Sequence, residues 1–180
     1  DAGRVSPGTE IVATGHALSV NVSNKLLGRV IDGLGKPIDG KGPIDTVERR
    51  SIYATPPNPL ERKRITKPMA TGIRSIDTLK TCGIGQRVGI FAGSGVGKSV
   101  TLGMIARYAS SDVNVICLVG ERGREVGEFL DKELGEEGLR RSVVIVATSD
   151  QAALIRIKAA FMATTIAEFF RDQGLNVVLM

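Results

Sequence analysis

The chain has 180 residues, 42% hydrophobic and 24% charged, which predicts one globular domain of ordinary size with room for a small partial one. Aromatic residues make up 4% and tryptophan is absent, so we expect an aliphatic core suited to the buried strands of a parallel sheet. No apolar stretch approaches the ~18 residues of a membrane span, and no signal peptide is visible.

The formal net charge of +5 comes from basic residues that are mostly scattered, and their tightest group is Arg62, Lys63, Arg64 and Lys67. Such a group is either a solvated basic linker or a contact for an acidic partner or an anionic membrane surface. Cys82 and Cys117 match no metal-binding spacing, and Cys117 lies in an apolar run, so we expect a reduced thiol buried in the core. The lone histidine, His16, supports neither a metal site nor a catalytic triad.

The first 50 residues carry strand and turn signals. Apolar and polar residues alternate over 18–22, which predicts a half-buried strand, and 26–31 is a second short run, mostly apolar. Glycine, proline and aspartate then crowd the segment 33–40, as is typical of turns. Residues 51–67 hold three prolines and the basic group, so we expect a linker or an edge segment wrapped around a core.

From Gly72 onward, helix and strand signals alternate. We predict helices over 73–80, 98–109, 124–134 and 151–172, and strands over 87–91, 114–119, 142–147 and 176–180. Asp150 is expected to cap the last helix and Gly174 to stop it. This alternation predicts an α/β fold with a parallel sheet and right-handed crossovers. The chain starts at Asp1 and stops at Met180 inside an apolar run, so we interpret it as a piece of a longer polypeptide.

A phosphate-binding loop is predicted at Ala92–Ser99, which reads AGSGVGKS between a predicted strand and a predicted helix. The general pattern has glycine at its first position, where this chain has Ala92. The glycines let successive backbone amides turn toward a phosphate, and the following helix adds its N-terminal dipole. Lys98 would contact the β- and γ-phosphates and Ser99 would ligate Mg²⁺, so we expect ATP and Mg²⁺ as ligands. The expected nucleotide contacts are Gly93, Ser94, Gly95, Val96, Gly97, Lys98 and Ser99.

A second polar cluster follows the predicted strand 114–119, where the sequence reads GERGRE over 120–125. Ligands of open parallel sheets bind beyond the carboxyl ends of the strands, so Glu121 and Arg122 would lie beside the phosphate loop if the strands are neighbours. Glu121 could then polarise an attacking water, and Arg122 could orient that water or complement phosphate charge. The alternative is a salt-bridged surface helix start, since acidic residues favour a first turn. Glu125 is expected to cap the helix or face solvent. An Asp that organises Mg²⁺ usually appears at the far end of a strand such as 176–180, and the sequence stops before one.

In combination, AGSGVGKS, GERGREV and AEFFRDQG resemble the type III secretion ATPases, the flagellar export branch especially, which are related to the catalytic subunits of rotary ATP synthases. The resemblance extends over nearly the whole chain. LLGRVIDGLGKPIDGKGPI is similar to the segment that leaves the family's N-terminal β-barrel, and TGIRSIDTLKTCGIGQRVGIF to the approach to its phosphate loop.

The resemblance implies a P-loop NTPase core of the RecA/F1 type, a parallel sheet with helices on both faces, incomplete at its C-terminal end and preceded by a remnant of the barrel. The implied parts are the end of the barrel over 1–22, a barrel-exit segment and linker over 23–71, and the ATPase core over 72–180. Glu121 matches the family's catalytic glutamate, Arg122 the arginine beside it, and Glu125 a second acid near the metal. Lys98, Glu121 and Arg122 are therefore the implied catalytic residues, and Ser99 and Glu125 the implied metal ligands.

The resemblance further implies a cytoplasmic homohexamer, peripheral to the inner membrane, that couples Mg-ATP hydrolysis to the release of export chaperones and the unfolding of export substrates at a membrane export gate. No nucleic acid partner is expected. The 180-residue chain alone is expected to bind nucleotide weakly and to turn over little or nothing. Three alternatives stay open: a catalytic subunit of a proton-coupled ATP synthase, an RNA-translocating hexamer, and a non-catalytic nucleotide-binding ring subunit.

Overall fold

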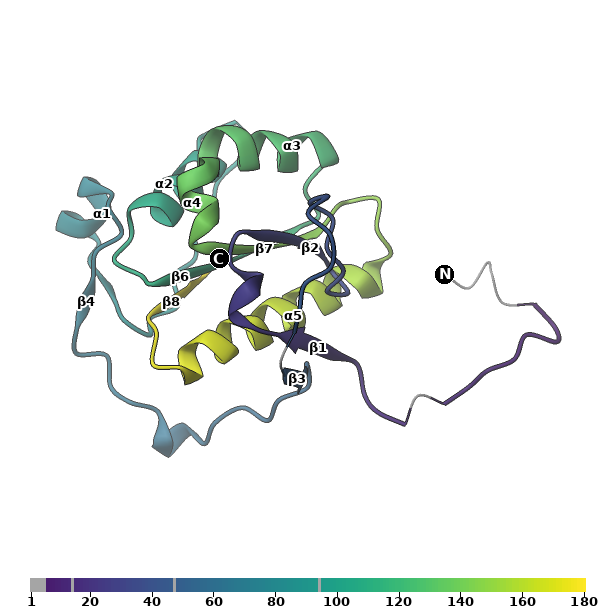
Figure 1. The fold of residues 1–180 in the computed structure, drawn as a ribbon. Coiled ribbons are helices and arrows are strands. Elements are labelled where there is room, and N and C mark those ends of the chain that lie inside the picture. Colours follow the sequence, from purple (N-terminus) through teal and green to yellow (C-terminus); the bar gives the residue numbers. More distant parts are fainter. Residues whose placement is uncertain (1–5, 14, 47, 94) are drawn as a thin grey trace.

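A four-stranded sheet forms the centre of the molecule. The structure is a computed structural model that describes residues 6–13, 15–46, 48–93 and 95–180. The strand order is β2-β7-β6-β8, and every neighbouring pair is parallel (Figure 1). The strands are β2 (Arg29–Asp32), β6 (Val113–Val119), β7 (Ser142–Ala147) and β8 (Val177–Leu179). The predicted α/β class and the predicted strands at 114–119, 142–147 and 176–180 are confirmed.

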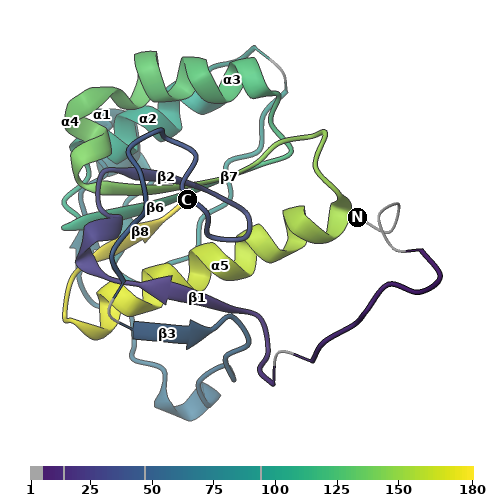
Figure 2. The ribbon, with the colours of Figure 1, turned by 45° about the vertical axis from the view of Figure 1, so that its right-hand side comes forward.

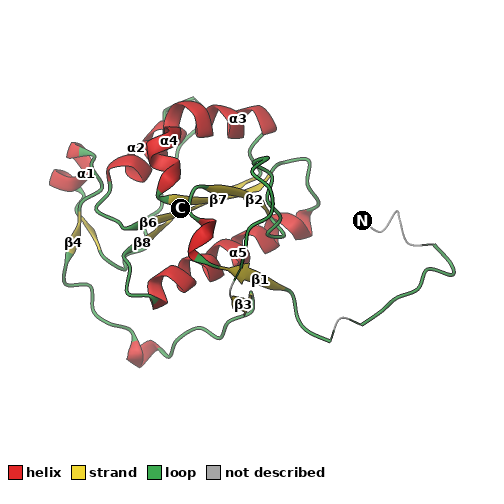
Figure 3. Cartoon of the chain, in the orientation of Figure 1, coloured by secondary structure: helices red, strands yellow, loops and turns green. Residues whose placement is uncertain are grey.

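Helices cover both faces of this sheet, as expected (Figure 3). The long helix α5 lies on one face, and α2, α3 and α4 lie on the other (Figure 1). The helices are α1 (Arg74–Leu79), α2 (Lys98–Tyr108), α3 (Gly123–Glu128), the π-helix η4 (Phe129–Leu134), α4 (Gly135–Arg140) and α5 (Ala153–Asp172). The short 3₁₀ turns η2 (Asn24–Leu26) and η3 (Pro59–Glu61) lie before α1 in the chain.

The two faces of the sheet bury separate clusters of aliphatic side chains, because successive residues of a strand point to opposite faces. Val143 and Ile145 of β7 pack with Met162 and Phe170 of α5. Their neighbours along β7 pack instead with α2, α3 and η4, through residues that include Val144, Val146, Ala106, Phe129 and Leu134. Burial on both faces explains the nearly continuous Val and Ile runs of β6 and β7.

The N-terminal part packs against α5 and also adds a strand to the sheet. β1 (Ser19–Val22) pairs antiparallel with β3 (Glu48–Ser51), and this pair lies beside α5 (Figure 2). Val20 and Val22 are buried in the α5 cluster, which confirms the predicted half-buried strand. β2 follows and pairs with β7 at the edge of the sheet. A further short pair joins β4 (Pro68–Met69) to β5 (Cys82–Gly83). The division of the chain at residues 22 and 71 stays a prediction.

The predicted strand at Arg87–Phe91 is wrong, since this segment has no regular secondary structure. Val88 is 58% exposed and Phe91 97% exposed. Residues 85–89 form one wall of a cavity of about 620 Å³ whose other wall includes residues 177–180 of the β8 edge. The alternating apolar residues of 87–91 favour a strand, but a strand needs a partner at hydrogen-bonding distance, and the cavity separates this segment from the nearest edge.

Two further predictions about helix ends need correction. The helix predicted at 124–134 continues as α3, η4 and α4 to Arg140, and Gly135, with φ 64°, forms the junction at which the path turns. α5 begins at Ala153 with Ala152 as its N-cap, so Asp150 does not cap it. The Asp150 carboxyl instead accepts a hydrogen bond from Thr148, which lowers its pKa. Gly174, with φ 84°, follows the end of α5 as predicted.

The predicted burial of Cys117 also needs correction, because this residue is only half-buried in β6, whereas Cys82 is buried. Cys117 still packs against the α5 cluster. Loss of contact with water penalises the thiolate and raises the pKa of Cys117 to about 11. The thiol is therefore protonated at neutral pH, as expected of a structural cysteine.

Candidate functional site

The phosphate loop ends where α2 begins. Gly97 is the N-cap of α2 with φ 89°, and Gly95 has φ 77°. Both values lie in the left-handed region, which costs any other L-residue steric strain, so the backbone here requires glycine. The Gly97 carbonyl accepts hydrogen bonds from both the backbone N–H and the hydroxyl of Thr101, each at 2.9 Å. The predicted loop-to-helix arrangement is present, and Ser94 lies outside the described residues.

The loop leaves room for an anion beside the N-terminus of α2. A Cβ atom added to Gly93, Gly95 or Gly97 would meet no atom within 4 Å. Lys98 and Ser99 are exposed in the first turn of α2. The first N–H groups of a helix lack partners within the helix, and the helix dipole places partial positive charge there. The geometry therefore suits a phosphate group approached by backbone amides, by Lys98 and by the Ser99 hydroxyl.

Glu121 is held at the carboxyl end of β6. Gly120 continues the ladder by donating its N–H to the Ala147 carbonyl at 2.8 Å. The Glu121 carbonyl accepts the N–H of Ser149 at 3.0 Å, which ties the end of β6 to the loop after β7. Ser149 was not predicted as part of the site; its position two residues after the buried strand β7 is the signal that could have found it. The backbone of Glu121 is thus fixed on two sides.

Lys98 and Glu121 meet across the site, with 3.8 Å between Nζ and Oε1. The two side chains are 43% and 33% exposed, so the ion pair is partly solvated and contributes little to stability. A weak pair of this kind can open when a phosphate competes for the ammonium group, which leaves the carboxylate near the bound phosphate. This places a cation for phosphate and a candidate base for water next to each other.

Arg122 and Glu125 form the start of α3. The Arg122 N–H donates to Glu125 Oε2 at 3.3 Å, and the guanidinium lies 3.9 Å from Oε1 of the same carboxylate. The pKa of Glu125 is lowered, chiefly by this backbone hydrogen bond and also by the positive charges of Arg122 and Arg124. Glu125 therefore caps α3, the role that the residues themselves suggested. The predicted contacts of both residues with nucleotide or metal stay predictions.

The residues present fit a magnesium ion that is bound mainly through a nucleotide. No group of three or more His, Cys, Asp or Glu side chains suited to a metal occurs in the described part of the chain. Mg²⁺ needs no such cage, because it is usually held by one or two protein oxygens together with phosphates and water. The Ser99 hydroxyl at the start of α2 is an oxygen of this kind. Two carboxylates lie nearby in the chain that follows β6, Glu121 in the connection to α3 and Glu125 in the first turn of α3.

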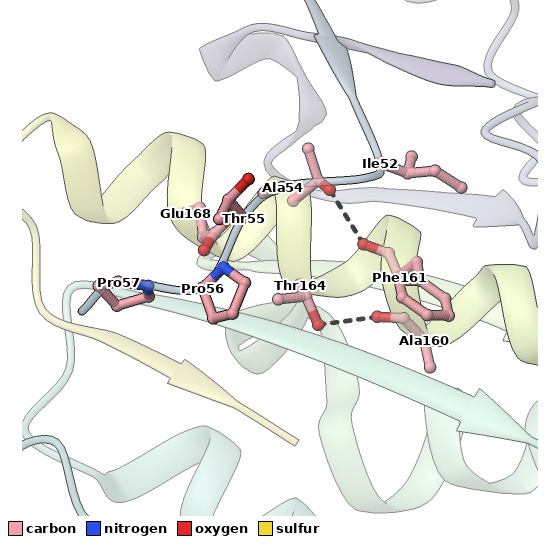
Figure 4. Close-up of a pocket in the computed structure, with 10 residues that line it drawn as sticks. Ile52, Ala54, Thr55, Pro56, Pro57, Ala160, Phe161, Thr164 and Glu168 are labelled. Carbon is pink, nitrogen blue, oxygen red and sulfur yellow. Dashed lines mark hydrogen bonds between the residues drawn. The ribbon is translucent and has the colours of Figure 1, made fainter. Parts of the chain in front are cut away.

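A second cavity, of about 340 Å³, lies apart from the loop between α5 and residues 52–57 (Figure 4). Its walls include Pro56, Pro57 and Phe161. The hydroxyls of Thr164 and Thr165 donate to carbonyls of α5 itself, at 2.9 and 3.0 Å. Among the predicted nucleotide contacts that the structure describes, none lines this groove, so we do not include it in the candidate site.

Comparison with known proteins supports the sequence resemblance. Residues 72–180 match the model of the ATP synthase alpha/beta family, nucleotide-binding domain. The chain is 56% identical over 180 residues to the flagellum-specific ATP synthase of Bacillus subtilis (strain 168), covering 100% of this chain and 41% of that protein. It is 54% identical over 172 residues to the type 3 secretion system ATPase of Xanthomonas euvesicatoria, covering 96% of this chain and 39% of that protein. The chain thus spans about two-fifths of the length of these relatives.

Solved structures match the fold as well. One, a prototypical ATPase from the type III secretion system of pathogenic bacteria, superposes with a TM-score of 0.86 at 56% identity. The match covers 91% of this chain and 47% of that one. The assembled ATPase EscN in complex with its central stalk EscO, from enteropathogenic E. coli, gives the same TM-score of 0.86 and 56% identity over 91% of this chain and 40% of that one.

Proposed function

The chain belongs to the ATP synthase alpha/beta family as its nucleotide-binding domain, and on this basis we propose that it binds and hydrolyses Mg-ATP within a ring-forming ATPase that energises flagellar or type III protein export. The observation that carries the proposal is the meeting of Lys98 and Glu121 beside an open glycine loop at the start of α2. A subunit that only bound nucleotide would have no need of a carboxylate at that position.

Each site residue has a definite task in this proposal. Backbone amides of the loop and the Lys98 ammonium bind the β- and γ-phosphates, and the Ser99 hydroxyl holds the metal. Mg²⁺, when bound, neutralises developing charge on the phosphate oxygens. Glu121 accepts a hydrogen bond from water and orients it toward the γ-phosphorus. Arg122 complements the charge on the transferred phosphoryl group, and Glu125 contributes to the metal site from the first turn of α3.

The assembly and its partners are proposed from the relatives. EscN is described as an assembled ATPase and as a complex with its central stalk, which supports a homohexamer for the full-length protein. Export chaperones, export substrates and a membrane export gate are the proposed partners, and the inner face of the cytoplasmic membrane is the proposed location. Within the described ranges, no helix combines the length and apolar character that a membrane crossing requires.

The proposal is tested by Glu121→Gln in the full-length protein. Glutamine keeps the size of the side chain but cannot act as a base, so kcat for ATP hydrolysis should fall by about 10²–10⁴-fold, while the affinity for a non-hydrolysable ATP analogue stays near that of the parent. Steady-state phosphate release and equilibrium binding measure the two quantities.

Glu128→Gln is the matched control, because Glu128 is exposed at the end of α3 and its substitution removes the same charge. This variant should retain the parent rate. Unchanged turnover in Glu121→Gln would contradict the catalytic role and would favour a ring subunit that binds nucleotide without hydrolysing it.

A further inference from the structure

The juxtaposition of Lys98 and Glu121 does not arise from neighbouring strands, because the segment before the phosphate loop is not part of the sheet. Lys98 belongs to α2, and Glu121 precedes the continuous path of α3 and η4. These two helical segments pack against each other on one face of the sheet (Figure 1). Their mutual packing is therefore the structural element that relates the two halves of the site.

The two segments come close together at Gly103, which is buried in the middle of α2. A Cβ atom on Gly103 would lie 2.7 Å from Glu133 Cβ, 2.8 Å from the Glu133 carbonyl oxygen and 3.0 Å from its carbonyl carbon. Two of these three atoms are backbone, so no side-chain rotation could make room. The backbones of α2 and η4 can approach this closely only because residue 103 is glycine.

Arg107, one turn after Gly103, holds the same part of η4. Its Nη1 donates to the Glu133 carbonyl, and at 3.4 Å to the Lys132 carbonyl. The carbonyls accept from a charged donor, which makes this contact stronger than a bond between neutral groups. Gly103 and Arg107, with the carbonyls of Lys132 and Glu133, form what we call the α2 clamp.

The C-terminal end of α2 is held separately. The Ser110 N–H donates to the Ala70 carbonyl at 2.9 Å, and the Ala70 N–H donates to the Ser110 hydroxyl at 3.2 Å. By contrast, Lys98 and Ser99 at the other end are exposed. α2 is thus fixed at its middle and at its far end, and its free end carries the phosphate-binding side chains about 7–8 Å beyond the clamp.

We propose that Gly103 and Arg107 are positioning residues, whose contact with the backbone of Lys132 and Glu133 fixes α2 on η4 and thereby sets the separation of Lys98 and Glu121. The inference rests on the proposed ATPase function for its catalytic consequence. Its structural consequence, the placement of α2 relative to α3, is independent of that function.

The test compares Gly103→Ala with Gly127→Ala. Both glycines are helical, but a Cβ on Gly127 would meet no atom within 4 Å, so the control makes the same chemical change in open space. Spin labels are placed at the exposed positions 100 in α2 and 124 in α3, through Val100→Cys and Arg124→Cys in a background where Cys82 and Cys117 are replaced by serine. Double electron–electron resonance on the folded chain then reports the distance between the helices.

We expect Gly103→Ala to lengthen or broaden this distance and Gly127→Ala to leave it unchanged. In the full-length protein, Gly103→Ala should lower kcat by on the order of 10–100-fold, because displacement of a reacting group by about 1 Å has effects of this size. KM should change little, since Lys98 and the loop still bind nucleotide. Arg107→Ala should act in the same direction, and Arg107→Lys, which keeps a charged donor, should recover part of the loss.

If Gly103→Ala does not fold, the two Arg107 variants carry the same comparison against Gly127→Ala. The proposal would be overturned if the clamp variants had the same spin-label distance and the same kcat as the control. It would also be overturned if the clamp variants had a lower melting temperature while the spin-label distance and kcat stayed unchanged. If the parent protein hydrolyses no ATP, the proposed function fails, and the distance measurement alone still decides whether the clamp positions α2.

Discussion

Asp39 is the residue whose surroundings most clearly show how single side chains hold the N-terminal part on the sheet. Arg29 of β2 donates to both of its oxygens, with Nε at 2.6 Å and Nη2 at 2.9 Å, and the two side chains are only 12% and 6% exposed. The N–H groups of Val30 and Lys41 donate to the same carboxylate at 3.1 Å each. This arrangement closes the turn-rich segment 33–40 onto the strand β2.

Asp39→Asn should lower the free energy of unfolding by about 2–3 kcal/mol, because it leaves the sheltered Arg29 without its counter-charge. Urea denaturation followed by circular dichroism measures the change. Asp45→Asn is the control: it breaks the Lys25–Asp45 pair, whose side chains are 66% and 81% exposed, and it should not change stability measurably. Equal effects of the two substitutions would contradict the assigned role of Asp39.

The same pair predicts a pH dependence. The hydrogen bonds from Arg29, followed by those from the backbone, hold the pKa of Asp39 well below its usual range. A lowered pKa in the folded state contributes stability that is present above the unfolded pKa of about 4 and is lost as the pH falls toward the folded value. Between about pH 5 and pH 2 the parent should therefore lose stability more steeply than Asp39→Asn.

At the residue scale, the sequence predicted the local backbone geometry best at positions where that geometry requires one residue type. Glycine at 95 and 97 and the adjoining Lys98 and Ser99 form a pattern whose backbone geometry could be predicted directly. The proximity of Glu121 was also predicted, but for the wrong reason. It was expected from neighbouring strands, and it results from the packing of α2 on η4, which depends on contacts between residues 30 positions apart.

Among the elements, α5 has the clearest relation between sequence and structure. It also has an N-cap residue that could be replaced by one that stabilises the helix. Its 20 residues bury one face, as the spacing of its apolar residues predicts. Its N-cap is Ala152, whose backbone is non-helical, with φ −54° and ψ 141°, and whose side chain makes no hydrogen bond to the first turn. The unpaired N–H groups of that turn would be better satisfied by a serine at this position.

Ala152→Ser should therefore raise the free energy of unfolding by about 0.5–1 kcal/mol and the melting temperature by about 1–4 °C. Differential scanning calorimetry checks this directly. Ala160→Ser, at an exposed position inside the same helix, introduces the same hydroxyl where it cannot cap and should be neutral or slightly destabilising. Stabilisation by both variants, or by neither, would refute the capping argument.

Other elements show the limits of local reasoning. The pattern at 87–91 is a strand pattern by composition, but strands form in pairs, and the pairing depends on which edges the rest of the chain presents. The π-helix η4 has no local signature either. It was predicted as ordinary helix that ends at Leu134, whereas the chain continues through Gly135 into α4. In both cases tertiary contacts, which a local pattern does not contain, decide the outcome.

For the whole molecule, the layered α/β architecture follows from two sequence properties that hold over long stretches. The apolar runs of β6 and β7 require cover on both faces, and the intervening helices supply it. The layers place the carboxyl end of β6 and the N-terminus of α2 at one common site. The addition of β2 to the edge of the sheet was not predicted, because its partner β7 lies more than 100 residues away in the sequence.

The most direct test is calorimetric titration of the chain with Mg-ATP, in parallel with Lys98→Ala and with Lys25→Ala as a control. Lys25 is an exposed lysine paired with Asp45, outside the site. The parent and Lys25→Ala should bind Mg-ATP with the same affinity, and Lys98→Ala should bind at least about tenfold more weakly, which corresponds to about 1.4 kcal/mol. Binding by Lys98→Ala as tight as that of the parent would contradict a phosphate site at the start of α2.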